Sequence, residues 1–292
     1  MVIGASILAI WQHLPSHITP VIFTVAGFSL RWYSLMYLVA LGIVYLLSAW
    51  RIRRKEITVP ADEASLQTVV FASVVGILLG GRLGYVLIYD LSYFIRHPME
   101  ILLPFSFSGG IHYTGFSGLS FHGGLIGVLL VFAYLSWRRR WAFLDLTDAL
   151  APAIPLAYTF GRIGNFINGE LYGRVTDLRV GMVFPMDPYQ RLRFPSQLFE
   201  AALEGLALFA VLWLLRNRRP FKGFLSGVYL MGYGVARFFV EFTREPDPQL
   251  GFVLGPLSMG QVLCLFMIAA ALVLWANQWY LASRQKVLKN RL

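Results

Sequence analysis

Residues 251–283 include no Asp, Glu, Lys or Arg, and this uncharged stretch limits the folds that the chain can adopt. A helix of about 20 apolar residues crosses a bilayer, so this stretch alone is long enough to span one. Of all 292 residues, 57% are hydrophobic and 14% are charged. Soluble domains carry roughly 25% charged residues. The sequence therefore predicts an all-α polytopic membrane protein, with residues 1–292 forming a single integral membrane domain.

Apolar runs alternate with clusters of basic residues. Seven spans are predicted, at about residues 32–50, 68–90, 119–137, 143–165, 196–215, 224–242 and 259–280. Basic clusters directly follow the first, third, fifth and seventh spans, at residues 51–55, 138–140, 216–222 and 284–291. Loops rich in Lys and Arg stay in the cytoplasm. We therefore expect the N-terminus on the outer side of the membrane and the C-terminus in the cytoplasm. The net charge of +10 is explained by this topology and does not indicate nucleic-acid binding.

The loops predicted on the outer side, residues 91–118, 171–195 and 244–258, are longer than the inner loops. Long connections are often functional. Residues 171–195 are expected to form a small periplasmic cap with short strands, between spans four and five. Residues 2–11 are apolar but too short to span, and we expect them to form an interfacial arm.

Polar residues are dense in residues 161–174, at the outer end of span four. This segment includes Arg162, Asn165, Glu170 and Gly173. Polar groups in a membrane are costly and usually functional, and glycines let a ligand approach the backbone closely. The segment therefore predicts a pocket for an anionic lipid headgroup. Two prolines, at positions 152 and 155, are expected to bend or break the helix before Gly161.

Span six carries Tyr233, Arg237 and Glu241 at a spacing of four residues, so one helix face presents all three. Two interpretations remain open. Arg237 and Glu241 either neutralise each other as a structural pair, or Glu241 orients a guanidinium that binds phosphate through its bidentate fork.

Three further features accompany these segments. His122 precedes the span-three glycines Gly123 and Gly124, which we expect to clear space around its ring. A histidine there is a structural donor, a phosphate partner or a general base. Tyr33 lies at the outer end of span one with Tyr37, where interfacial aromatic belts also occur.

A glycine ladder on span two predicts close helix packing, and its members are Gly76, Gly80 and Gly84. Arg82, inside this ladder, is a candidate substrate-binding residue. The single cysteine, Cys264, permits no intrachain disulfide or thiolate metal cluster. No phosphate-binding loop, zinc motif or dinucleotide fingerprint is present.

Six blocks of sequence occur in an order that we identify with a known family. They lie at residues 32–37, 80–85, 120–124, 161–174, 195–198 and 232–241, within residues 20–280. In these blocks the chain resembles the bacterial phosphatidylglycerol–prolipoprotein diacylglyceryl transferases. The resemblance implies a seven-span inner-membrane enzyme that transfers diacylglyceryl from phosphatidylglycerol to the lipobox cysteine of a preprolipoprotein signal peptide. A thioether forms, and glycerol phosphate leaves. The resemblance also implies a periplasmic N-terminus and no metal or cofactor.

The resemblance also implies roles for the candidate residues. Arg162 and Arg237 would bind the phosphate, while Glu170 and Glu241 would orient these two arginines. His122 would be the base. The headgroup pocket would further involve Tyr33, Asn165, Gly173, Tyr233 and Arg82. The chain departs from the family at Phe194 and Phe199, where a histidine and a tyrosine are usual, and in a longer, glycine-rich loop at residues 105–118.

Two other functions fit parts of the pattern. An intramembrane serine protease would use Ser117 or Ser120 with His122, but it leaves the two arginines without a purpose. A phospholipid transporter or flippase would also place arginines on a lipid path. Transporters often contain inverted repeats, and no convincing internal repeat is found in this sequence.

Overall fold

The computed structural model describes residues 2–25, 28–101, 103, 105–106, 112–113, 118–245 and 252–289. It divides into two compact units. The first unit comprises residues 1–48 and 147–292, and the second comprises residues 49–146.

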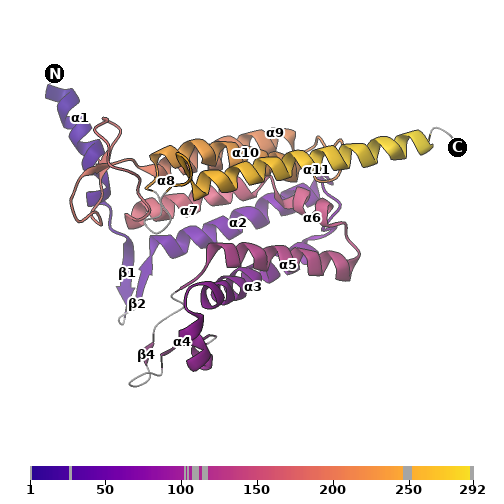
Figure 1. Ribbon diagram of the computed structural model, residues 1–292, viewed down its shortest axis with the longest axis horizontal. Helices are drawn as coiled ribbons and strands as arrows, with labels where there is room; N and C mark the ends of the chain where they lie inside the picture. The colour runs from indigo at the N-terminus through magenta and orange to yellow at the C-terminus, as the bar shows by residue number, and fades with distance from the viewer. Residues whose placement is uncertain are drawn as a thin grey trace. The chain divides into compact units, whose positions relative to one another are not determined.

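Long apolar helices dominate the chain (Figure 1). Within the described residues, five helices are long and apolar enough to cross a membrane. They are α2 (Trp32–Arg53), α3 (Glu63–Ile88), α5 (Phe121–Arg139), the continuous helix Ser196–Leu215, and α11 (Met259–Lys289). The predicted all-α polytopic membrane fold is therefore confirmed. The count of seven spans stays a prediction, because α7 (Ile154–Asn168) and α10 (Phe224–Val240) have only 15 and 17 residues.

The helix over residues 196–215 is not uniform. It begins as α8 (Ser196–Glu200), widens into the π-helical segment η3 (Ala201–Ala207) and ends as α9 (Leu208–Leu215). π-Helical turns are rare and are frequent at functional sites. This one occurs where α8 and η3 pack against α7.

Span four is interrupted, as its two prolines predicted. α6 (Phe143–Leu150) and α7 are separated by a turn over residues 151–153. Pro155 then occupies the first turn of α7, where a missing N–H is tolerated. α7 ends at Gly169, whose φ of 70° is the left-handed conformation that favours glycine.

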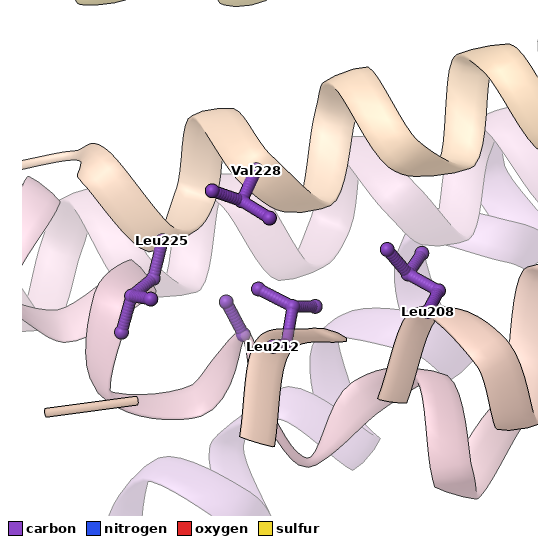
Figure 2. Packing of buried hydrophobic residues seen from close by; sticks show 5 residues of the cluster. Leu208, Leu212, Leu225 and Val228 are labelled. Atoms are coloured by element: carbon purple, nitrogen blue, oxygen red, sulfur yellow. The ribbon is translucent and has the colours of Figure 1, made fainter. Parts of the chain in front are cut away.

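Helices α9 and α10 meet in an apolar core. Leu208 and Leu212 of α9 pack with Leu225 and Val228 of α10, and Ala151 joins them (Figure 2). Partly buried Tyr233 and Trp275 extend this cluster towards α11. This core aligns α10 with the helix over residues 196–215.

Short antiparallel hairpins connect the helices of the first unit. β1 (Val21–Val25) pairs with β2 (Phe28–Arg31), and β7 (Phe252–Leu254) pairs with β8 (Leu257–Ser258). β5 (Met182–Val183) and β6 (Leu192–Arg193) pair within residues 171–195, so the expected short strands are present there. That this segment forms a periplasmic cap stays a prediction.

The predicted N-terminal arm is helical. It comprises α1 (Val2–His13) and the 3₁₀ turn η1 (Leu14–His17), and both contact β5. The indole of Trp11 donates a hydrogen bond to the carbonyl of Val180 over 3.1 Å. The arm is therefore attached to the cap segment.

In the second unit, α3 and α5 pack through glycine. A Cβ atom on Gly84 would lie 2.7 Å from the Cα of Gly123, and one on Gly76 would lie 2.9 Å from the carbonyl oxygen of Gly127. A Cβ on Gly80 would collide with the carbonyl of Gly123. The predicted packing role of the ladder is confirmed. The expectation that Gly123 clears space around His122 was wrong, because its missing side chain admits α3.

The remaining elements of the second unit follow α3. They are α4 (Leu91–Arg96), the 3₁₀ turn η2 (Pro98–Ile101), β3 (Phe105–Ser106) and β4 (His112–Tyr113). β3 and β4 pair with each other. Residues 107–111 and 114–117 lie outside the described residues. The loop at residues 105–118, which was expected to be longer and richer in glycine than in the family, is therefore described only in part.

Candidate active site

Three arginines from different elements converge on one carboxylate. Glu200, on α8, is fully buried and lies 2.7 Å from the Nε of Arg162, on α7. Its other oxygen lies 3.5 Å from Arg237 on α10 and 2.5 Å from Arg244, just after the 3₁₀ turn η4 (Glu241–Thr243). Sequence reasoning missed both Glu200 and Arg244 as members of the site.

A second carboxylate holds two of these arginines. Glu241 lies 2.7 Å from the Nη2 of Arg237 and 3.6 Å from the Nε of Arg244. Ser258 donates a hydrogen bond to its other oxygen over 3.0 Å. The expected pairing of Arg237 with Glu241 is thus present, and the side-chain contacts fix the direction of the guanidinium.

Glu170 does not pair with Arg162 directly. The side-chain amide of Asn165 donates to Glu170 over 2.8 Å, and Arg162 donates to the amide oxygen of Asn165 over 3.1 Å. Asn165 therefore lies between the two charged groups. The direct carboxylate partner of Arg162 is Glu200, and Glu170 orients the arginine only through the amide.

Tyr158 and Glu204 complete the charged cluster, and neither was predicted. The guanidinium of Arg162 lies over the Tyr158 ring, 4.7 Å from its centroid. The Tyr158 hydroxyl donates to Glu204 over 2.5 Å and also lies 3.1 Å from Glu200. The ring of Tyr233 meets that of Tyr158 edge-on at 5.9 Å.

A sequence signal for the two carboxylates did exist. Glu200 and Glu204 are the only charged residues in residues 196–215, an otherwise apolar span, and they lie one turn apart. Charged residues inside a span are expected to be functional and to have a partner.

Tyr33 lies beside the helix that carries Arg162. A Cβ atom on Gly164 would lie 3.1 Å from its ring, so α2 and α7 approach closely at this glycine. The Tyr33 hydroxyl is 2.9 Å from that of Tyr37. The predicted tyrosine is thus adjacent to α7.

Gly173 makes a close backbone contact. Its N–H donates to the carbonyl of Phe194 over 2.8 Å, and it forms an antiparallel bridge with Arg244. A side chain here would collide with the carbonyl of Thr243. Glycine is therefore needed to bring the cap segment against the residue that pairs with Glu200.

Outside the spans, ion pairs of Arg193 also join residues 171–195 to the chain that follows η4. Arg193 of β6 binds Asp187 with two hydrogen bonds of 3.0 and 3.1 Å, and it binds Glu245 over 2.8 Å. Hydrogen bonds from Arg193 hold the pKa of the Asp187 carboxyl below its usual value, and this pairing raises the pKa of Arg193. The cap segment is thus attached to the chain that follows Arg237 and Glu241.

His122 and Arg82 belong to the second unit. His122 is exposed in the first turn of α5, with its ring edge-on to Phe121. Arg82 donates to the carbonyls of Ile101 over 2.9 Å and Glu100 over 2.6 Å. Arg82 thus binds the backbone of η2. Its role in substrate binding stays a prediction.

The serine protease alternative receives no support from Ser120. Its hydroxyl accepts a hydrogen bond from the N–H of Gly123 over 3.3 Å, which caps the N-terminus of α5. Ser117, the other nucleophile considered, lies outside the described residues.

The site can bind an anion. Each guanidinium has five N–H donors, so one that holds a carboxylate can bind phosphate through another edge. Within the described part of the chain, no group of three or more His, Cys, Asp or Glu side chains is arranged to hold a metal ion. The carboxylates of the cluster are directed at arginines and at Tyr158.

The helices and the buried arginine cluster define a multi-pass membrane protein with a charged centre among its helices. Residues 20–277 match the family model described as prolipoprotein diacylglyceryl transferase. The chain belongs to this family, as its sequence blocks indicated.

Individual relatives agree over nearly their full lengths, and all three below carry the name phosphatidylglycerol–prolipoprotein diacylglyceryl transferase. The relative from Chlorobaculum tepidum is 50% identical over 271 residues, covering 92% of this chain and 93% of the relative. The relative from Bordetella avium is 46% identical, covering 91% and 97%. The relative from Geobacter sulfurreducens is 41% identical, covering 93% and 98%.

Proposed function

We propose that this protein transfers the diacylglyceryl group of phosphatidylglycerol to the lipobox cysteine of a preprolipoprotein. Family membership makes it a transferase of lipoprotein maturation. The observation that carries the substrate assignment is the cluster of Arg162, Arg237 and Arg244 around Glu200. A lipid phosphate supplies the anion for which such a cluster is suited.

The reaction forms one bond and breaks one. The substrate thiol attacks the glyceryl carbon attached to the phosphate, a thioether forms, and the carbon–oxygen bond breaks to release glycerol phosphate. The thiol proton passes to a base, because the thiolate is the nucleophile and a free thiol has a pKa of about 8.5. Negative charge grows on the leaving phosphate, and arginines held in place stabilise that charge.

The candidate residues have distinct roles in this proposal. Arg162 and Arg237 bind the phosphate, and Glu241 orients Arg237. Asn165 and Glu170 hold Arg162 in the chain of hydrogen bonds described above. Tyr33, Gly173 and Tyr233 form or support the headgroup pocket. In the second unit, Arg82 is proposed to bind substrate and His122 to accept the thiol proton.

The proposal includes a bacterial inner-membrane location with the site towards the periplasm. Basic residues end α2 and α5 and follow α9, which supports a cytoplasmic side there. The N-terminus is then periplasmic and the C-terminus cytoplasmic. Residues 171–195 are the periplasmic cap in this orientation.

Mass spectrometry tests the transfer directly. Purified protein is incubated with phosphatidylglycerol and a synthetic lipobox peptide, and the expected product is the peptide plus one diacylglyceryl group on its cysteine. No mass gain, beside an active relative as positive control, contradicts the proposal. Movement of labelled lipid between leaflets without transfer favours a lipid transporter instead.

Arg237→Lys tests the phosphate assignment. Lysine keeps the charge but loses the fork, so we expect turnover to fall about 100-fold. Arg53→Lys is the matched control, because Arg53 is 67% exposed at the end of α2. Near-normal turnover of Arg237→Lys argues against bidentate phosphate binding.

A further inference from the structure

Glu204 is a buried carboxylate that the roles above do not use. It is fully buried in the π-helical segment η3. Within the described structure its guanidinium contact is with Arg237 at 4.0 Å, too long for a hydrogen bond. Among the described residues, its Oε1 has no hydrogen-bond partner. A carboxylate with so few partners is costly inside a membrane span, which points to a specific use.

Glu200, one turn earlier on the same helix, provides a direct comparison. Both side chains are fully buried. Glu200 contacts three arginines, the closest two at 2.5 and 2.7 Å. Glu204 instead binds the hydroxyl of Tyr158 over 2.5 Å. The arginines are therefore neutralised mainly by Glu200 and Glu241, whereas Glu204 accepts a hydrogen bond from an uncharged side chain, Tyr158.

That ring supports one of the phosphate-binding arginines. The guanidinium of Arg162 lies 4.7 Å from the centroid of the Tyr158 ring. A cation over the face of an aromatic ring is attracted by the ring, and this fixes the plane on which it lies. Because Tyr158 and Arg162 lie four residues apart on α7, they share one face of that helix. Any tilt of the ring would move the guanidinium.

The backbone around Glu204 limits its movement. Thr159, next to Tyr158, donates to the carbonyl of Ala201 over 3.4 Å. A Cβ atom on Gly205 would collide with the Thr159 side chain, so the backbone of η3 lies directly against α7 at this point. The widened turn therefore holds Glu204 at a fixed place opposite Tyr158.

We propose that Glu204 and Tyr158 form a positioning pair for Arg162. Glu204 fixes the phenol, the phenol ring supports the guanidinium, and Arg162 is thereby held for the lipid phosphate. Neither Glu204 nor Tyr158 needs to touch the substrate. This inference rests on the proposed function, since it assigns the two residues to the phosphatidylglycerol side of the reaction.

Three variants test the pair: Glu204→Gln, Tyr158→Phe and the double variant. Tyr158→Phe keeps the ring but removes the hydroxyl. Tyr229→Phe is the matched control, because Tyr229 stacks on Tyr233 in the same apolar cluster and contacts no arginine in the described structure. KM for phosphatidylglycerol and KM for the lipobox peptide are measured separately, together with the Kd for phosphatidylglycerol in detergent.

Each single variant is expected to raise the lipid KM and Kd about tenfold, while the peptide KM changes less than about twofold. A smaller folded fraction lowers the apparent kcat but leaves KM unchanged, so this pattern separates positioning from misfolding. The double variant is expected to resemble the more affected single variant, because both changes act on the same hydrogen bond: glutamine removes the charge of its acceptor and phenylalanine removes its donor. Tyr229→Phe is expected to behave as the wild type.

The pair is refuted if lipid KM and Kd stay at wild-type values, or if the two effects multiply in the double variant. A loss in kcat alone also refutes it. The Kd measurement does not depend on turnover. If the wild type binds the lipid but transfers nothing, the proposed function fails while Glu204→Gln still decides the positioning role.

Discussion

Glu200→Gln tests whether the convergence of three arginines on Glu200 stabilises the fold. Glutamine keeps the volume of the side chain, so no cavity forms, but it removes the negative charge shared by Arg162, Arg237 and Arg244. Removing one partner of a buried ion pair costs about 3–5 kcal/mol. At about 2 °C per kcal/mol for a chain of this size, the melting temperature should fall by roughly 6–10 °C.

The single cysteine offers a clean assay. Cys264 lies on α11 and is 2% exposed, so a thiol-reactive fluorescent dye labels it only when the packing around α11 opens. Labelling is followed during slow heating of the purified protein in detergent. One cysteine gives one signal, and the midpoints of wild type and variant can be compared directly.

Glu63→Gln is the matched control. Glu63 pairs with Arg53 over 2.7 Å, but their side chains are 36% and 67% exposed. Exposed pairs contribute about 0–1 kcal/mol, so this midpoint should move by no more than about 2 °C. If Glu200→Gln melts as close to the wild type as this control does, the cluster does not contribute to stability as inferred.

Three further predictions concern other parts of the chain. His122→Gln keeps hydrogen bonding but removes basicity, so transfer should slow about 100-fold, and unchanged turnover would remove His122 as the base. Gly80→Ala should lower the melting temperature because the added Cβ would collide with the carbonyl of Gly123. Gly42→Ala is the control and should not lower it, because no atom lies within 4 Å of the added Cβ. Equal melting temperatures for the two variants would contradict the packing role of Gly80. Asp187→Asn should lower the melting temperature at pH 7. Because Arg193 depresses the pKa of Asp187, the stabilisation is present above the unfolded-state pKa and is lost as pH falls below about 4. The difference from the wild type should therefore narrow in acid, and a constant difference would refute this assignment.

Local patterns in the sequence predicted much of the architecture. The hydropathy of residues such as 259–280 predicted the membrane helices, and the paired prolines predicted the break between α6 and α7. The four-residue spacing of Arg237 and Glu241 predicted their ion pair. Each of these depends on neighbours along the chain, which is why periodicity and composition were sufficient.

Contacts between elements were harder to predict. Arg82 was predicted as a substrate-binding residue, and its hydrogen bonds to two carbonyls of η2 were not foreseen. Gly123 was expected to make room for a histidine, but it makes room for α3. In both cases the residue type was informative, while the group that it faces depends on how a second helix or loop is rotated against it.

The sequence by itself determined that this chain is a membrane protein of the diacylglyceryl transferase family, and it identified Arg162 and Arg237. Only the tertiary structure decided that Glu200 faces both of them. Glu200, Arg162 and Arg244 lie on three different elements, and their meeting depends on the relative depth and rotation of α7, α8 and α10. Charges inside a membrane must find partners, but the choice of partner is made by packing between helices, which no local pattern encodes.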